Sequence, residues 1–409
     1  MPGVYLTASI MATSQEIRHL DTGYDLYADY HRLRQTEPVR WDPELRSWYL
    51  TRYSDVSALL RDRRLSSQRP APVRTGLSAE IQNAIHWLDR CLQLWMIFKE
   101  PPDHSRLRNV CNRSFAAGIV HALEPRIKSF IDDLIESFPD RGVVDFVESF
   151  AYPLPSMTIG EMIGVRPTDV PMLAAWSADI VEAFGTGRPT VRAARSYRRI
   201  SEYFDEMTKK DTALTHLMRV FTTAAQESVV SQEELLANCA FLLLAGHDTT
   251  TNLIANGLFS LLKNPGQFAR LRTDDTLAPL AVEELLRFES PIQYVSRTAR
   301  EDLLVGDRLI RCGDRVLLSI GAANRDPEQF AFPDQLDIGR TENAHLAFIA
   351  GVHYCLGAPL ARLEGRLVLE ALVHRFESLE LLDEAPEWKP DPALRSLKRL
   401  LVKVTKAAV

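Results

Sequence analysis

The sequence predicts a mainly α-helical protein with small β-sheets. Long segments place apolar residues at helical spacing, whereas segments that alternate apolar and polar residues are few and short. Helices and strands do not alternate regularly, which argues against a doubly wound α/β fold. No repeat, low-complexity tract or linker divides the 409 residues. We therefore expect residues 1–20 to form an N-terminal tail, a candidate for disorder, and residues 21–409 to form a single domain.

Composition and charge exclude several classes of protein. Hydrophobic residues make up 46% of the chain, charged residues 25%, and the formal net charge is −6, which does not favour nucleic-acid binding. The first residues show no basic leader followed by an apolar core. The most apolar run, "AFLLLAG", is far shorter than the about 20 residues that span a bilayer. We expect a cytoplasmic monomer that binds neither nucleic acid nor membrane.

The first elements expected are two short strands and a helix. The segments 38–42, "PVRWD", and 47–53, "SWYLTRY", alternate in polarity around the turn "DPELR". A helix is predicted over 126–138. Its apolar face is expected to comprise Ile127, Phe130, Ile131, Leu134 and Ile135.

The longest predicted helix covers residues 231–263. Ser231 is suited to cap it, with Glu234 three residues later as in a capping box. Its middle is apolar nearly all round, which is typical of a helix through the centre of a large protein. A helix at 274–291, short strands over 302–324 and a helix at 359–376 follow.

The hexapeptide "AGHDTT" interrupts the apolar middle of the long helix. Glycine costs about 1 kcal/mol in a helix interior, and threonine hydroxyls there bond back to the preceding turn. Two interpretations remain. Either these polar residues meet a polar neighbour, or the helix opens locally, with Gly246 making room for a small ligand and Asp248 and Thr249 beside it.

Cys355 is the cysteine in the most unusual surroundings. The five cysteines are odd in number, widely spaced and without a Cys-x-x-Cys pair, which argues against a disulfide framework or a zinc site. Cys355 lies between Gly351 and Gly357, two residues after His353 and just before a predicted helix. An inert buried thiol and a thiolate presented to a cofactor both fit this pattern.

Several motifs in order and spacing resemble the cytochrome P-450 superfamily, the haem-thiolate monooxygenases. They are "FIAGVHYCLG" around Cys355, "AGHDTT", the Glu284-x-x-Arg287 pair, and "PPDHSRLR", with further matches in "AANRDP", "FPDQLDIGR" and "HLAF". The resemblance runs from "WDPELRSWYLTRYSDV" to the C-terminus. It implies the cytochrome P-450 fold, a single two-lobed domain with haem between the long central helix and the helix after the cysteine.

The resemblance also implies residue roles. Cys355 would be the axial thiolate ligand of heme b, and Asp248 with Thr249 would deliver protons during dioxygen activation. Glu284, Arg287 and Arg340 match a buried structural network. The residues matched to haem binding are His104, Arg108, Ala245, Gly246, Arg297, Phe348, Gly351, His353, Cys355 and Gly357, where the two glycines of the loop are expected to permit tight turns.

The substrate pocket is expected to have apolar and aromatic walls drawn from distant segments. The candidates are Trp87, Leu94, Trp95, Ile97, Leu243, Leu244, Ile292, Val295 and Leu397. Such walls suit a mid-sized hydrophobic or aromatic molecule, such as a secondary-metabolite intermediate. Ordinary core packing is the alternative for each of them.

The resemblance implies hydroxylation or a related oxidation with dioxygen. Electrons would come from NAD(P)H through a separate ferredoxin and ferredoxin reductase. Oxidative coupling or desaturation by the same haem chemistry, a peroxide-driven enzyme and a non-catalytic haem sensor or carrier are alternatives. Asp248 and Thr249 argue against the last two. Arg106, Arg113, Arg362 and Arg366 would form a basic docking face, unless they pair with carboxylates such as Glu364 and Glu370.

The chain departs from the family's pattern in two places. Ile349 stands where the family's cysteine loop usually has glycine, and a β-branched residue disfavours positive φ, so this loop is expected to differ in detail. The segment "MTKKDTALTHLM", around Lys210 and Asp211, looks shorter than the connection usual before the long helix.

Overall fold

The computed structural model describes residues 25–68, 78–185, 190–209 and 214–408. Within these ranges the chain is mostly helical with small sheets, as predicted. The tail expected at residues 1–20 and the short connection at Lys210 and Asp211 lie outside the described residues.

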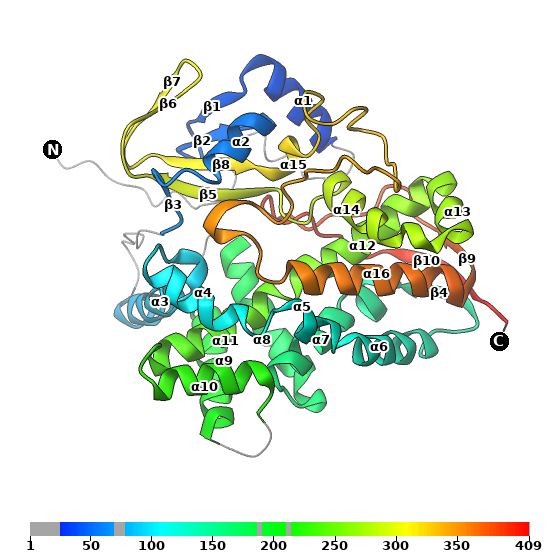
Figure 1. Cartoon of the computed structure of the whole chain (residues 1–409), viewed down its shortest axis with the longest axis horizontal. Helices are drawn as coiled ribbons and strands as arrows, with labels where there is room; N and C mark the ends of the chain where they lie inside the picture. Colours follow the sequence, from blue (N-terminus) through cyan, green and yellow to red (C-terminus); the bar gives the residue numbers. More distant parts are fainter. Residues whose placement is uncertain (1–24, 69–77, 186–189, 210–213, 409) are drawn as a thin grey trace.

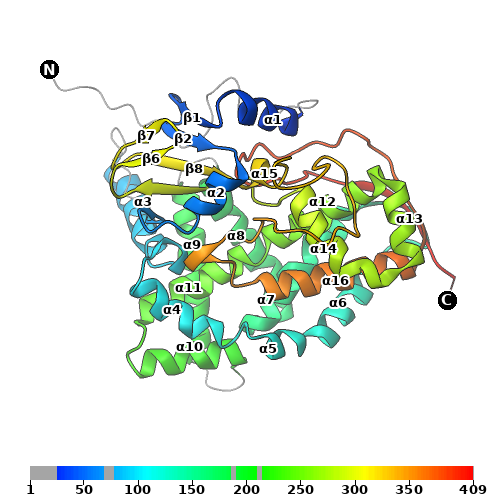
Figure 2. The ribbon, with the colours of Figure 1, turned by 45° about the horizontal axis from the view of Figure 1, so that its top comes forward.

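A five-stranded sheet forms one side of the molecule, in the order β1-β2-β8-β5-β3. Its β2–β8 pairing is parallel, with Trp48 opposite Val316, and the other neighbours run antiparallel. Three helices lie close to this sheet in both ribbon views (Figures 1 and 2). The elements of this side are β1 Val39–Asp42, β2 Ser47–Leu50, β3 Leu65–Ser66, β5 Tyr294–Ala299, β8 Arg315–Ser319, α1 Leu26–Thr36, α2 Tyr53–Leu59 and α15 Ile320–Ala323.

Helices fill the rest of the described molecule, together with the smaller sheets β4-β10-β9 and β6-β7 (Figures 1 and 2). The helices are α3 Ala79–Leu92, α4 Asp103–Asn112, α5 Ala117–His121, α6 Glu124–Glu136, α7 Pro153–Ile163, α8 Val170–Gly185, α9 Val191–Lys209, α10 His216–Gln226, α11 Gln232–Ala245, α12 Asp248–Lys263, α13 Pro265–Thr273, α14 Ala278–Phe288 and α16 Ala358–Arg375. The strands are β4 Arg141–Asp145, β6 Leu303–Val305, β7 Arg308–Ile310, β9 Phe376–Leu381 and β10 Leu401–Lys406.

The long helix predicted over 231–263 is two helices, so that prediction is wrong as a single element. α11 begins at the predicted capping box, where the Ser231 hydroxyl accepts from the Glu234 amide and the Glu234 carboxylate accepts from the Ser231 amide. It ends at Ala245, and α12 starts at Asp248. The break falls at Gly246, where a residue of low helix propensity meets a competing threonine hydroxyl.

The other predicted elements are present with shifted ends. β1 and β2 occupy the predicted strand segments, and the Asp42 carboxylate accepts from the Leu45 amide at 2.8 Å to hold the turn between them. The predicted face of α6 is buried, except that Leu134 is only partly so. α14 is shorter than predicted, because a 3₁₀ turn precedes it and it ends three residues before Pro291.

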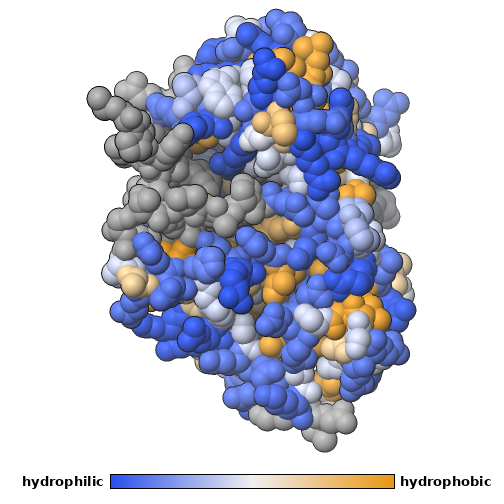
Figure 3. All heavy atoms as spheres, turned by 90° about the vertical axis from the view of Figure 1, so that its left-hand side faces the viewer, coloured by the Kyte–Doolittle hydropathy of each residue, from blue (hydrophilic) through white to orange (hydrophobic). Residues whose placement is uncertain are grey.

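The surface seen from the left of Figure 1 is predominantly hydrophilic. Apolar side chains on this face gather in small, separate patches (Figure 3). Among the described residues, no helix combines the length and the apolar character needed to cross a bilayer. This face therefore does not present one large apolar surface.

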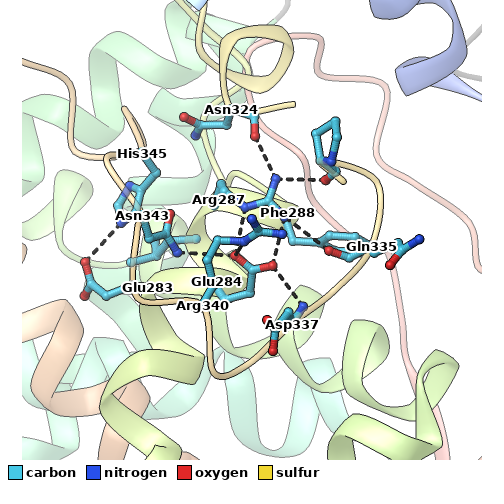
Figure 4. Close-up of polar contacts among 12 residues, drawn as sticks. Glu283, Glu284, Arg287, Phe288, Asn324, Gln335, Asp337, Arg340, Asn343 and His345 are labelled. Atoms are coloured by element: carbon cyan, nitrogen blue, oxygen red, sulfur yellow. Dashed lines mark hydrogen bonds and ion pairs between the residues drawn. The ribbon is translucent and has the colours of Figure 1, made fainter. Parts of the chain in front are cut away.

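A buried ionic network joins α14 to the segment that precedes the cysteine loop (Figure 4). The Arg287 guanidinium donates to both carboxylate oxygens of Glu284 at 2.8 Å, and neither side chain is exposed. Arg340 donates to the same carboxylate at 3.1 Å. Arg287 also donates to the backbone carbonyls of Asn324 and Pro333. The structure thus brings together the three residues that the resemblance matches to a structural network.

The network leads directly to the loop that carries Cys355. The Asn324 side chain accepts from the Leu346 amide at 2.7 Å and donates to the Ser290 hydroxyl at 2.8 Å. The Leu346 carbonyl in turn accepts from the Ile349 amide at 2.7 Å. Because buried ion pairs are costly unless fully hydrogen-bonded, this satisfied arrangement specifies one position for the loop.

We expect Arg287→Ala to lower the free energy of unfolding by about 3–5 kcal/mol, because it leaves the Glu284 carboxylate buried without its main partner. Urea denaturation followed by circular dichroism measures the change. Lys403→Ala is the control, since it breaks the exposed Lys403–Glu380 pair and is expected to change stability by less than about 0.5 kcal/mol. Equal effects of the two variants would contradict a structural role for Arg287.

Candidate active site

Cys355 lies in a short loop between the network and α16. The Cys355 amide donates to the Phe348 carbonyl at 3.0 Å, which closes the loop. The Phe348 ring is buried beneath the Arg362 guanidinium, whose carbon lies 4.5 Å from the ring centre. α16 begins three residues after the cysteine, so the positive end of an 18-residue helix lies close to the sulfur.

The surroundings of the Cys355 thiol act on its pKa in opposite directions. Burial raises the pKa and is the larger effect. The Gly357 and Ala358 amides and the Arg108 charge lower it. Helix N-termini and nearby cations are the settings in which proteins stabilise thiolates. The loop therefore presents a cysteine with amide donors in place, and a metal ion would complete its deprotonation.

Ile349 adopts a left-handed backbone conformation, with φ of +53°. The expectation that a β-branched residue keeps this position out of positive φ is therefore wrong. Its side chain packs against an apolar cluster that includes Leu60, and its amide is held by the Leu346 carbonyl. These contacts offset a conformation that costs roughly 1–2 kcal/mol for a residue with a Cβ.

Gly351 and Gly357, the two glycines of the cysteine loop, differ in backbone conformation and in surroundings. Gly351 has φ of +74°, and a Cβ there would lie 2.7 Å from the Leu60 carbonyl oxygen at the end of α2. Gly357 lies in the turn that leads into α16, but its φ of −81° is one that any residue adopts, so the turn itself does not require glycine. Apart from Gly357 and its two chain neighbours, no atom of the described residues lies within 4 Å of the place its Cβ would take. The open space beside Gly357, next to Cys355, is where a bound group would have room.

Four basic side chains from three separate segments gather near Cys355. The rings of His104, on α4, and His353 lie 4.4 Å apart, and His104 Nδ1 is buried without a protein partner. Arg297, on β5, is buried and donates to the neighbouring Ser296 carbonyl. Arg108 lies close enough to Cys355 for each to influence the other's pKa. The cluster is well suited to bind an anion with two carboxylates.

Burial and mutual repulsion lower the pKa values within this cluster. The pKa of His353 falls to about 3, through burial and then the charges of Arg297 and His104. Burial also lowers the pKa of Arg297, which the Glu100 charge opposes. Glu100 accepts from the Ser67 amide at 2.7 Å, and the Ser67 hydroxyl is bonded to His353 at 3.0 Å. An added anion would relieve this repulsion, because opposite charges stabilise the cations.

The break between α11 and α12 presents Ala245, Asp248 and Thr249. The Thr249 hydroxyl donates to the Ala245 carbonyl at 3.0 Å, across the break. Ala245 is exposed although Leu244 before it is buried, which marks an accessible space beside the helix. Burial raises the pKa of Tyr152 to about 12, and the charge of Asp248 adds to this effect.

Gly246 has a packing reason of its own. A Cβ on Gly246 would lie 3.0 Å from Ile159 Cγ1 on α7 and 3.1 Å from the Leu242 carbonyl oxygen. The missing side chain therefore makes room for α7, a packing role that the sequence did not predict. His247 beside it is buried and bonds to the Tyr152 carbonyl at 3.1 Å. The break thus meets a polar neighbour, as the first interpretation expected, and exposes Ala245. The room for a ligand beside it stays a prediction.

The predicted pocket residues fall into separate groups. Trp87 and Trp95 both contact the Tyr197 ring, at 5.8 and 6.2 Å between ring centres. Ile292 forms a bridge with Leu394, which brings it to the turn that carries buried Leu397. Leu243 and Leu244 are buried in α11, and Leu243 lines a hollow between α7 and α8. Leu94 is partly buried, Ile97 exposed, and Val295 packs in the sheet-side cluster.

Sequence reasoning missed two residues that shape this region. Tyr197 lies in the arginine-rich segment "RAARSYRRI", which has the composition of a solvent-exposed helix face. Its hydroxyl accepts a hydrogen bond from the Trp95 indole N–H at 3.1 Å. Asn238 is a buried amide in the apolar middle of α11. Its polarity in an apolar helix was the available signal.

The arginines expected to form a basic docking face are mostly neutralised. Arg362 pairs with Glu283 at 2.7 Å, and Arg106 with Glu234 at 2.6 Å. Arg366 pairs with both Glu124 and Glu370. Glu364 takes no part, because it is buried away from these arginines, and burial raises its pKa to about 8. Paired arginines contribute little field, so the basic-face hypothesis loses most of its support.

Comparisons with known proteins match this chain to one family. The family model described as cytochrome P450 matches residues 192–404. Cytochrome P450 107B1 of Saccharopolyspora erythraea is 36% identical over 93% of this chain and 95% of its own length. Cytochrome P450 monooxygenase PikC of Streptomyces venezuelae is 36% identical over 94% and 92% of the two chains. The solved structure of P450BioI with an acyl carrier protein that carries hexadec-9Z-enoic acid has a TM-score of 0.86 and 31% identity, over 96% of this chain and 100% of that chain.

The fold, the cysteine loop and these relatives define a haem-thiolate oxygenase. The chain belongs to the cytochrome P450 family and is a P450 monooxygenase. Membership in this family implies haem, thiolate ligation of its iron and dioxygen as co-substrate.

We expect Gly351→Ala to lower the free energy of unfolding by at least about 2 kcal/mol, because an alanine there combines positive φ with a backbone clash. Gly118→Ala is the matched control, since its Cβ meets nothing within 4 Å, and it is expected to be neutral or up to about 1 kcal/mol more stable. Urea denaturation of both variants decides the matter. Equal stability of the two would show that α2 does not approach Gly351 as described.

Proposed function

We propose that this P450 monooxygenase holds heme b through Cys355 and oxidises a mid-sized hydrophobic or aromatic small molecule in secondary-metabolite biosynthesis. The observation that carries the haem assignment is the buried His104 Nδ1 without a partner, within a cluster of four basic side chains beside a cysteine. Both features fit a haem, which has two carboxylates on one edge and an iron at its centre.

The residues of the site divide the binding of the haem between them. Cys355 would supply the axial sulfur, with the Gly357 and Ala358 amides as hydrogen-bond donors to it. His104, Arg108, Arg297 and His353 would hold the propionates. The open space at Gly357 would let the porphyrin approach the loop, and exposed Ala245 would border the opposite side. When bound, the haem supplies dioxygen activation and the oxidation of the substrate.

Asp248 and Thr249 would deliver the protons that this reaction consumes. The Thr249 hydroxyl donates to Ala245, and its oxygen retains lone pairs that accept a hydrogen bond from a water or substrate. Asp248 is partly exposed at the first turn of α12, next to Thr249, so a proton can pass from solvent through its carboxylate. Retention of this acid–alcohol pair supports an enzyme over a haem sensor or carrier.

The substrate class is inferred from the walls and from relatives. Trp87, Trp95, Tyr197 and Phe241 form a contiguous aromatic group beside α11, which suits an apolar or aromatic ligand. Similar proteins include 6-deoxyerythronolide B hydroxylase of Saccharopolyspora erythraea and the polyketide biosynthesis cytochrome P450 PksS of Bacillus subtilis. Hydroxylation is the proposed reaction, with electrons from NAD(P)H through a separate ferredoxin and ferredoxin reductase.

We expect Cys355→Ser to abolish the red-shifted absorption band that thiolate-ligated haem shows in its reduced carbon monoxide complex, because a serine hydroxyl cannot replace the thiolate. Difference spectroscopy of the purified protein measures the band. Cys312→Ser is the control, since Cys312 is exposed in the turn between β7 and β8 and its removal should leave the band in place. A band that persists in Cys355→Ser would assign the ligand to another cysteine.

We expect Thr249→Ala to reduce the product formed per NADPH consumed by at least about tenfold, because proton delivery by a positioned group contributes 10²–10⁴-fold. Haem content and substrate-induced spectral shifts should not change. Thr251→Ala is the matched control, since its hydroxyl is buried in the same helix without a partner. Turnover with ferredoxin and reductase measures the coupling, and equal coupling in both variants would remove Thr249 from proton delivery.

A further inference from the structure

Asn238 is a buried amide whose hydrogen-bonding capacity is directed out of its own helix. It lies on α11 and is fully buried. Its side-chain oxygen accepts from the Met96 amide at 2.9 Å, and its nitrogen donates to the Leu94 carbonyl at 3.0 Å. The same nitrogen also donates to the Glu234 carbonyl one turn earlier, at 2.8 Å. One side chain therefore bonds to the backbone on both sides of Trp95.

The segment that Asn238 holds is the connection between α3 and α4. This connection carries Trp95 and leads into α4, where His104 and Arg108 lie. A 3₁₀ turn, Met96–Phe98, follows the tryptophan directly. The segment also has backbone bonds of its own, such as that from the Trp95 amide to the Leu92 carbonyl at 3.0 Å. The two bonds from Asn238 attach this segment to α11 and so help to place Trp95.

The Trp95 ring is held against a group of aromatic side chains. It stacks on Phe98 with ring centres 6.1 Å apart and lies 5.2 Å from the Phe241 ring centre. Its indole N–H donates to the Tyr197 hydroxyl at 3.1 Å. Asn238 and Phe241 lie three residues apart on α11 and so share one helix face. Exposed Ala245 is a further four residues along, which extends this face to the break between α11 and α12.

A second bond from the same face of α11 supports this arrangement. Glu234 is four residues before Asn238, and its carboxylate pairs with Arg106 of α4 at 2.6 Å. Arg106 also donates to the Val229 carbonyl at 2.8 Å. The start of α4 and the loop before it are thus both tied to α11.

We propose that Asn238 is a positioning residue that determines substrate size selection by holding Trp95 as one wall of the substrate cavity. This inference rests on the proposed function, because it presumes that the substrate binds beside α11. The hydrogen-bonding amide of Asn238 is required for this role, and not only the volume of its side chain. Its oxygen accepts from one backbone N–H, and its nitrogen donates to two backbone carbonyls.

The test compares Asn238→Ala with Asn252→Ala in the haem-loaded protein. Asn252 is also a buried asparagine, in α12, but its side-chain nitrogen has no protein partner. Imidazole and 4-phenylimidazole are the probes, and the spectral shift on binding to iron measures their dissociation constants. The dissociation constant of imidazole depends on access to the iron, whereas that of 4-phenylimidazole also depends on how the side chains around the iron contact the phenyl ring.

We expect Asn238→Ala to raise the dissociation constant of 4-phenylimidazole about tenfold, since a freed wall must be ordered before it contacts the ring. Imidazole binding should stay within about twofold in both variants. Amide hydrogen exchange of residues 93–99 should accelerate at least about tenfold in Asn238→Ala only, because one hydrogen bond contributes about that factor. Asn238→Ser should behave like Asn238→Ala, because a serine hydroxyl is too short to reach Met96 and bonds back to its own helix.

Unchanged exchange of residues 93–99, or an unchanged or lowered 4-phenylimidazole dissociation constant, would overturn the inference. Failure of the proposed function gives a different result. In that case the wild-type protein would lack the red-shifted carbon monoxide band, whereas the inference about Asn238 fails when the band is present in every variant.

Discussion

The buried Glu284–Arg287 pair is the interaction on which the rest of the site depends. Two charges leave water only where every lone pair and N–H finds a partner, and here the partners come from α14 and the segment before the cysteine loop. Asn324 links that segment to Leu346, and Leu346 fixes the turn at Ile349. The position of Cys355 therefore depends on an ionic network whose own residues are not among those expected to bind the haem.

The two central helices, α11 and α12, position different parts of the site. α12 packs on α16, where Leu253 would lie 3.4 Å from a Cβ on Gly365, and so places the proton-delivery pair relative to the helix after the cysteine. α11 holds the aromatic connection through Asn238. On the other side, the Asn256 amide of α12 donates to the Arg395 carbonyl at 2.7 Å, beside Ser396 and Leu397. Buried asparagines in apolar helices thus bind the backbone of two distant loops.

The electrostatics of the haem site explain why its residues come from separate elements. Basic side chains packed together without enough carboxylates repel one another, and burial lowers the pKa of His104, Arg297 and His353 further. No single helix could carry such a cluster at low cost. α4, β5 and the cysteine loop each contribute one part, and the anion completes the arrangement.

The sequence by itself determined the fold class, the capping box of α11, most element positions and the residues that resemble the P450 motifs, because these depend on local spacing and side-chain chemistry. It left open whether the helix breaks at Gly246 and whether Arg106, Arg362 and Arg366 pair with carboxylates, and it did not reveal the positive φ of Ile349. Each of these also involves a neighbour distant in sequence: Ile159 against Gly246, Leu60 near Ile349, and Glu234, Glu283 and Glu124 opposite the arginines. Tertiary packing decided these features. The end of a helix, a strained backbone conformation and the partner of a charged side chain all depend on the residues packed against them.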